Sequence, residues 1–149
     1  MPKASVKRLI ECDKDQLIDL VLDIEKYPTF VPYCIDAKIF KKKVNDDFII
    51  IIADLTIGKG PFNATYKSDV KYYKSTDTIL VTNIEGPLKH LNNKWTFLEK
   101  NNCTEISFDI DFEIKNKFLN ILMSKSFQYG LDKIADSFQK RANDLFKGK

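Results

Sequence analysis

Most of this chain alternates between apolar and polar residues with a period of two. A loose alternation runs from Ala4 to Cys12, and clearer stretches lie near residues 35–44, 47–57, 61–73, 77–84, 92–99 and 103–114. Successive side chains of a strand point to opposite faces, so this period predicts strands with one apolar and one polar face. In the last stretch, for example, Ile106, Phe108 and Phe112 share the apolar face. Such strands are typical of an antiparallel sheet that is covered on one side only.

Helical periodicity is confined to the two ends of the chain. Asp13 favours a helix N-cap, and the apolar residues that follow at helical spacing are Leu17, Leu20, Val21 and Ile24. Residues 117–146 predict a long amphipathic helix with the apolar stripe Phe127, Leu131, Ile134, Phe138, Ala142 and Leu145. Unbroken, this helix would span roughly 45 Å, enough to cross a bent sheet. The pattern predicts a single α+β domain, residues 1–149, whose curved antiparallel sheet of about seven strands wraps round the C-terminal helix.

Two breaks in the pattern indicate room between helix and sheet. The aromatic turn Tyr27–Cys34 contains two prolines, which exclude a regular helix or a central strand. Gly86 and Pro87 end a strand, because proline has no N–H for the ladder and glycine tolerates positive φ. We expect a short turn after them and a new strand that contains Trp95, the single tryptophan. A curved sheet interrupted in this way favours binding of an apolar guest over catalysis.

The net charge of +3 comes almost wholly from lysine, since Arg8 and Arg141 are the only arginines. Proteins that recognise specific bases favour arginine, whose guanidinium donates two parallel hydrogen bonds to a base edge. The scarcity of arginine therefore argues against sequence-specific DNA binding. A general attraction to anionic surfaces, ribosomal RNA or lipid headgroups, remains compatible with it.

Cys12, Cys34 and Cys103 are odd in number and widely spaced, which favours reduced thiols over a disulfide framework or a zinc site. The N-terminus reaches strand-like sequence at once, without the charged and apolar regions of a signal peptide. The longest apolar run, 48–53, is far below the roughly 20 residues of a spanning helix. We therefore expect a soluble, cytoplasmic protein that can touch a membrane surface.

Catalytic residue types are scarce. His90 is the only histidine, and we expect it on the surface in a lysine-flanked turn, because a catalytic base needs an orienting partner in an enclosed site. Asp109, Asp111 and Glu113 alternate with apolar residues and should lie on the solvated face. The sequence therefore predicts a protein that is not an enzyme and has no metal site.

The turn Tyr27–Cys34, the segment Gly86–Phe97, Phe108–Asn116 and Phe138–Ala142 together resemble the START-like, helix-grip family of coenzyme Q-binding proteins and ribosome association toxins, part of the polyketide cyclase/dehydrase and lipid transport superfamily. The resemblance runs from about Val6 to Phe146. Leu88 stands where the family pattern favours phenylalanine. Asn92 and Asn93 stand where a glycine-containing turn is common, a difference to which we attach no consequence.

The resemblance implies a lipophilic tunnel that holds ubiquinone or a related polyprenyl lipid as ligand, with no further cofactor, and a role in respiration or quinone delivery. In the other branch of the family it implies a toxin that binds the large ribosomal subunit and blocks subunit association. A polyketide cyclase-like enzyme is a weaker third reading. The lipid reading implies a cytoplasmic protein peripheral to the inner membrane, on the matrix side of the mitochondrial membrane if the source is eukaryotic.

Apolar and aromatic residues give the candidate ligand-binding set: each of them alone is better explained as core, but together they suit the wall of an apolar site. The set comprises Phe30, Val31, Tyr33, Leu55, Phe62, Tyr66, Tyr72, Leu88, Leu91, Trp95, Phe108, Phe112, Phe118, Leu122, Phe127, Leu131 and Phe138. Within it, the hydroxyls of Tyr66 and Tyr72 are candidate donors to a quinone carbonyl. Lys89, Lys94, Lys115 and Lys117 are candidates for one basic rim that contacts headgroups or ribosomal phosphates.

Overall fold

The computed structural model describes residues 3–59, 62–118, 120–121 and 127–146. The helical elements are α1 (Lys14–Leu22), the 3₁₀ helix η1 (Ile24–Thr29) and α3 (Phe127–Phe146). The strands are β1 (Lys3–Ile10), β2 (Cys34–Val44), β3 (Phe48–Lys59), β4 (Phe62–Tyr73), β5 (Thr78–Glu85), β6 (Leu88–Lys100) and β7 (Cys103–Ile114). All seven form one antiparallel sheet in the order β1-β7-β6-β5-β4-β3-β2.

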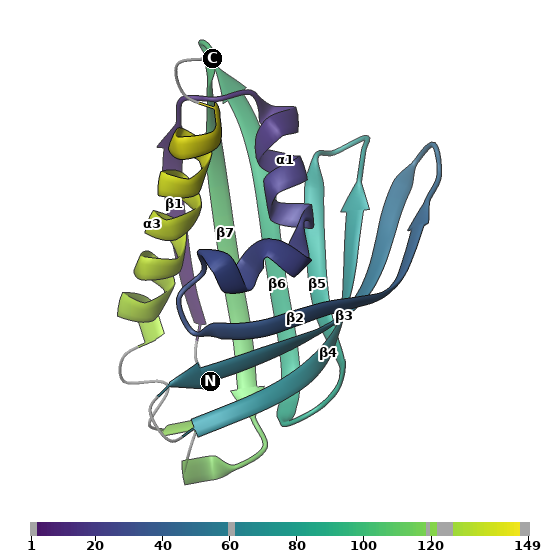
Figure 1. Cartoon of the computed structure of the whole chain (residues 1–149), viewed down its shortest axis with the longest axis vertical. Helices are drawn as coiled ribbons and strands as arrows, with labels where there is room; N and C mark the ends of the chain where they lie inside the picture. The colour runs from purple at the N-terminus through teal and green to yellow at the C-terminus, as the bar shows by residue number, and fades with distance from the viewer. Residues whose placement is uncertain (1–2, 60–61, 119, 122–126, 147–149) are drawn as a thin grey trace.

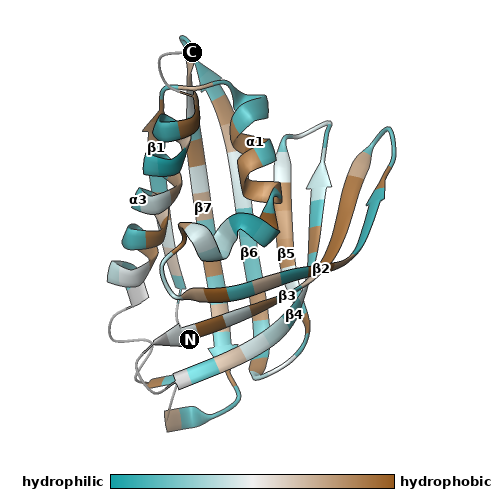
Figure 2. Cartoon of the chain, in the orientation of Figure 1, coloured by the Kyte–Doolittle hydropathy of each residue, from teal (hydrophilic) through white to brown (hydrophobic). Residues whose placement is uncertain are grey.

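The sheet bends strongly, and all three helical elements lie on its concave side (Figure 1). Strands β2–β4 curl across the view while β5–β7 run along the length of the molecule. Brown and teal bands alternate along β6 and β7 in Figure 2, which is the period-two pattern of the sequence seen in space. The predicted α+β, helix-grip architecture is confirmed, with the apolar face of the sheet turned toward the helices.

Three element boundaries differ from the prediction. Strand β6 begins at Leu88, immediately after Pro87, because a bulge between Leu88 and His90 lets pairing with β7 resume at once. The residues around Pro28 form the 3₁₀ helix η1, whose tighter turns accommodate a proline near a helix end. Helix α3 begins at Phe127, and the described helical residues between β7 and α3 are Lys117, Phe118, Asn120 and Ile121.

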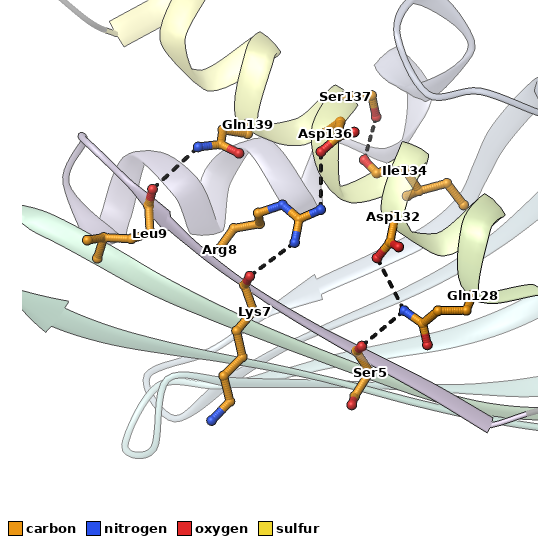
Figure 3. A network of polar contacts seen from close by, with 10 residues as sticks. All are labelled: Ser5, Lys7, Arg8, Leu9, Gln128, Asp132, Ile134, Asp136, Ser137 and Gln139. Atoms are coloured by element: carbon orange, nitrogen blue, oxygen red, sulfur yellow. Dashed lines mark hydrogen bonds and ion pairs between the residues drawn. The ribbon is translucent and has the colours of Figure 1, made fainter.

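Helix α3 is tied to the edge strand β1 by a row of polar contacts that we call the β1–α3 seam (Figure 3). Gln128 donates to the carbonyl oxygen of Ser5 at 3.3 Å, and Gln139 donates to that of Leu9 at 3.4 Å. Between them, the Arg8 guanidinium pairs with Asp136 at 3.1 Å. These side chains occupy carbonyl groups that an open sheet edge would leave unpaired.

An aromatic cluster joins α3 to the sheet and to η1. The Phe138 ring packs edge-on against Tyr27, Phe30 and Trp95, with centroids 5.4, 5.2 and 5.2 Å away. Trp95 in turn lies 4.2 Å from the ring of Phe108 on β7. Phe138 is only 3% exposed, so the cluster closes one end of the space between helix and sheet.

Candidate functional site: an apolar cavity between helix and sheet

A cavity of about 240 Å³ lies between the concave face of the sheet and the helices. Every strand from β3 to β7 contributes to its wall, together with α1, η1, α3 and the turn before β2. The strand contribution follows from the alternation, because residues two apart face the same side. Thus Leu91, Asn93 and Trp95 of β6 all line the cavity.

The wall is almost entirely apolar. Among the described residues, no side chain that lines it carries a charge, and the polar atoms belong to Tyr27, Tyr33, Cys34, Tyr66, Asn93 and Trp95. The Tyr27 hydroxyl donates to the carbonyl oxygen of Val21, and the Cys34 thiol donates to that of Asp36 at 3.6 Å. These two groups are satisfied by the backbone around the turn.

Two polar groups of the wall are not satisfied in this way. The amide oxygen Oδ1 of Asn93 is buried and accepts no hydrogen bond from any residue that the structure describes. The Tyr66 hydroxyl likewise makes no hydrogen bond to the described part of the chain, and burial raises the pKa of this phenol well above its usual range. At neutral pH the Tyr66 phenol therefore stays protonated, and its hydroxyl can donate a hydrogen bond to a bound group.

Gly86 sets the position of Tyr66. Its φ is +131°, and a β-carbon at this position would lie 2.8 Å from Cβ and 2.9 Å from Cα of Tyr66. Only glycine permits this approach of two backbones. Pro87 and Leu88 follow directly in the wall, so the strand break predicted at Gly86 forms one end of the cavity.

The structure brings most of the predicted ligand-binding residues together in the wall. These are Val31, Tyr33, Leu55, Tyr66, Leu88, Leu91, Trp95, Phe108, Phe112, Leu131 and Phe138. Their contact with a ligand stays a prediction. The side chains of Phe62, Leu122 and Phe127 lie outside the described residues.

Three predicted residues do not line the cavity. Phe30 packs behind the wall, between Phe138 and the Arg141 guanidinium, which lies 5.5 Å from its ring centroid. The Tyr72 hydroxyl donates to Asp77 at 3.1 Å, so this tyrosine is not the free donor that we expected. Phe118 is 69% exposed, because it lies on the short helical stretch after β7.

The four lysines do not form one rim. Three of them are exposed near the end of the cavity that Gly86 and Pro87 form, namely Lys89, Lys115 and Lys117. There the Lys115 N–H donates to the Pro87 carbonyl oxygen at 2.8 Å. Lys89 pairs there with Glu113 at 3.2 Å. Lys94 instead projects from the middle of β6 on the outer face, between the register partners Leu80 and Asp109.

His90 lies on strand β6, not in a turn, because that strand starts earlier than predicted. Its Nε2 lies 3.2 Å from Asp111 Oδ1, and both residues project from the outer face, away from the cavity. Among the described residues, no group of three or more histidine, cysteine or acidic side chains could hold a metal ion. No helix in the described ranges is long and apolar enough to cross a membrane.

Asn93 is a polar residue of the wall that the sequence patterns did not single out. A signal was present, since Leu91 and Trp95 both belong to the predicted ligand-binding set and Asn93 lies two residues from each of them. A polar residue at an inward position of a strand is an exception that calls for an explanation.

We expect slow alkylation of Cys34 in the folded protein. Burial and the nearby Asp36 carboxylate raise the pKa of this thiol from about 9 to about 11, so the thiolate appears only at high pH. At pH 7.5 its reaction with iodoacetamide, followed by peptide mass spectrometry, should be about a hundredfold slower than in urea-unfolded protein. Equal rates in the two states would contradict the burial of this group.

Comparison with known proteins supports the helix-grip fold and identifies the family. The sequence profile of the polyketide cyclase / dehydrase and lipid transport family matches residues 10–139. The ribosome association toxin RatA of Rickettsia prowazekii is 30% identical over 89% of this chain and 90% of its own length. The mitochondrial coenzyme Q-binding protein COQ10 of Dictyostelium discoideum is also 30% identical over 89% of the chain, which spans 64% of that relative.

A solved structure shares the architecture as well. The 18 kDa protein CC1736 from Caulobacter crescentus superimposes with a TM-score of 0.80, at 27% identity, over 97% of this chain and 98% of that one. The match of the family profile extends from the end of β1 into α3 and so includes nearly the whole cavity wall. The chain belongs to the polyketide cyclase / dehydrase and lipid transport family, as its sequence motifs predicted.

Proposed function

We propose that this protein binds ubiquinone or a related polyprenyl lipid in the cavity, without transforming it, and delivers it to or from a membrane. The observation that carries the proposal is an apolar wall that contains aromatic rings and no charged side chain among the described residues. A quinone ring with an isoprenoid chain offers the matching chemistry, an apolar surface with few polar atoms. The relative named as a coenzyme Q-binding protein supports the same ligand class.

The size of the cavity limits how much of the lipid it encloses. At about 240 Å³ it lies just below the roughly 300–1,000 Å³ of typical small-molecule sites. The ring and the first part of the chain occupy it in our proposal, and the remainder of a long tail leaves through the opening. A protein that carries a lipid with an exposed tail must deliver it at a membrane surface.

The same wall argues against catalysis. General acid–base chemistry needs a titratable group within hydrogen-bond reach of the substrate. In the described wall the ionisable groups are thiol and phenol, and burial raises the pKa of Cys34, Tyr27 and Tyr66 away from neutrality. His90 and Asp111 pair on the outer face, where they cannot reach a ligand in the cavity.

Extraction of the purified protein with organic solvent, followed by mass spectrometry, tests the proposal when the protein is made in a quinone-producing host. Ala64 lines the cavity, and Ala64→Phe should place a ring inside it and abolish the recovered quinone. The neighbouring Thr65 is exposed on the outer face, so Thr65→Phe adds the same ring without filling the cavity. Lipid-free wild-type protein, or equal lipid in both variants, would count against the proposal.

An exposed apolar patch at the end of the cavity gives this protein a surface for membrane contact. Phe118 and Ile121 are 69% and 58% exposed. The Asn120 side chain accepts a hydrogen bond from the Ile114 N–H at 3.1 Å, which holds this stretch at the end of β7, next to the cavity. The exposed Lys115 and Lys117 flank it. Apolar side chains between lysines suit the surface of an anionic bilayer.

The double variant Phe118→Ser, Ile121→Ser should bind vesicles of phosphatidylglycerol and phosphatidylcholine at least tenfold more weakly, because insertion of two large apolar side chains is lost. Sedimentation with the vesicles at low and high salt measures the change. Leu98→Ser is a matched control, since Leu98 is 57% exposed near the opposite end of β6. A similar loss for both variants would argue against a specific docking surface.

Binding to the large ribosomal subunit is a second candidate function. Lys41, Lys42 and Lys43 form an exposed run on the edge strand β2, and lysine clusters attract phosphate backbones. Relatives named as ribosome association toxins are among the similar proteins. Gradient sedimentation of lysate at low salt decides this role: co-migration with the large subunit supports it, and its absence there removes it.

A further inference from the structure

We propose that the cavity selects the oxidised quinone over its hydroquinone, because the described side chains of its wall offer a ligand protons and no reachable atom that only accepts. This preference rests on the proposed function and names the chemical form of its ligand. The residue that sets it is Tyr66, a wall residue whose hydroxyl makes no hydrogen bond to the described part of the chain.

Gly86 holds Tyr66 in place beside the cavity. A β-carbon at Gly86 would lie 2.8 Å from Cβ of Tyr66, so the two backbones pack directly against each other. Tyr27 and Cys34 lie near the phenol, but both already donate to backbone carbonyl oxygens. Among these three polar groups, the Tyr66 hydroxyl is the one whose proton remains available to a ligand.

Asn93 adds a second donor to the wall. Its amide oxygen is buried, so a ligand in the cavity meets the amide through its NH₂ group. Its register partners Val81 and Ile110 are aliphatic and give that group no side-chain acceptor. Trp95, two residues along the strand, contributes an indole that can only donate. The other polar side chains of the described wall are phenols and a thiol, and each of these carries a proton.

The two forms of the ring meet such a wall differently. The carbonyl oxygens of a quinone only accept, so they satisfy free donors and leave no group of their own unpaired. A hydroquinone brings two O–H protons, each of which needs an acceptor once it has left water. The backbone adds few acceptors, because each of the wall strands β3–β7 is paired with a neighbour on both sides. The reduced ring therefore binds with unsatisfied protons, and the oxidised ring does not.

A short-chain ubiquinone and its hydroquinone, kept reduced under anaerobic conditions, can be titrated against the intact protein. Trp95 is the only tryptophan of the chain and lies in the wall, so its fluorescence reports occupancy of the cavity. We expect the quinone to bind about tenfold more tightly than the hydroquinone. Because the oxidised form is favoured, the midpoint potential of the two-electron quinone couple should fall by about 30 mV on binding, the same ratio expressed as a potential.

Tyr66→Phe should reduce the preference to about twofold, because it weakens binding of the quinone and spares the hydroquinone. Tyr72→Phe is the matched control: it is the same substitution on the same face of β4, but the Tyr72 hydroxyl donates to Asp77, so the ratio should not change. Asn93→Leu should also lower the ratio, whereas Asn92→Leu, at an exposed position of the outer face, should not.

The carbonyl stretching band of the bound quinone gives a readout that a purely structural role would not move. A hydrogen bond lowers its frequency, so Tyr66→Phe should raise it again. Equal affinity for the two forms, a preference for the hydroquinone, or a preference that survives Tyr66→Phe and Asn93→Leu together overturns the inference while the proposed function stands. Failure of the wild-type protein to bind either form overturns the proposed function itself.

Discussion

Replacement of Phe138 with alanine should lower the free energy of unfolding by about 3–5 kcal/mol, the usual cost of deleting a buried ring. The ring is 3% exposed and makes edge-on contacts with Tyr27, Phe30 and Trp95, all of which would lose a packing partner. Domains of this size are stable by only about 5–15 kcal/mol, so the loss is a large share of the total. Urea unfolding followed by circular dichroism measures it.

Phe118→Ala is the matched control for this experiment. The residue type and the substitution are the same, but Phe118 is 69% exposed, so the change should stay within about 0.5 kcal/mol. Comparable losses at the two positions would show that α3 does not close the cavity as described. The Phe138 variant should also lose bound lipid, since this ring is part of the wall.

Gly86→Ala should destabilise the protein by about 2–4 kcal/mol. Its φ of +131° is unfavourable for an L-residue, and the new methyl group would meet the Tyr66 backbone at 2.9 Å. Backbone cannot rotate away as a flexible side chain can, so β4 and the end of β5 must separate. Thermal unfolding measures the loss, and Tyr66→Gly, which removes the Cβ that lies 2.8 Å from the new methyl group, should relieve part of it in a double-mutant cycle.

Gly130→Ala is the same substitution at another position, and it should stabilise the protein. A β-carbon there would lie 3.7 Å from Cε2 of Tyr33, an ordinary van der Waals distance. Gly130 lies within helix α3, where alanine is favoured over glycine by about 1 kcal/mol. A stabilised Gly130→Ala beside a destabilised Gly86→Ala would support the two environments described, whereas equal losses would contradict them.

The alternation of apolar and polar residues was sufficient to predict the sheet, because a one-residue error in strand register would move a whole apolar set to the solvent. It was not sufficient at Leu88, where a bulge restarts the strand directly after Pro87. A bulge arises from pairing with β7, and the sequence of β6 alone contains no period that reveals it.

The sequence was sufficient to predict many residues of the cavity wall, but not the hydrogen bonds that their side chains make. Leu91, Trp95 and Phe108 belong to the predicted ligand-binding set and lie in the wall. Tyr72 is also inward, yet its hydroxyl lies near Asp77, a neighbour that only the turn between β4 and β5 brings close. Whether a hydroxyl is free depends on such tertiary neighbours, and so does the unpaired oxygen of Asn93.

The β1–α3 seam bears on the shape of the cavity although none of its residues lies in the wall. Contacts at Gln128, Asp136 and Gln139 hold one side of α3 along most of its length, and a helix held in this way resists rolling about its axis. That resistance keeps Leu131 and Phe138 aimed at the sheet. Substitutions on the solvent side of this helix can therefore change the shape of the cavity, because they let α3 rotate without touching the wall themselves.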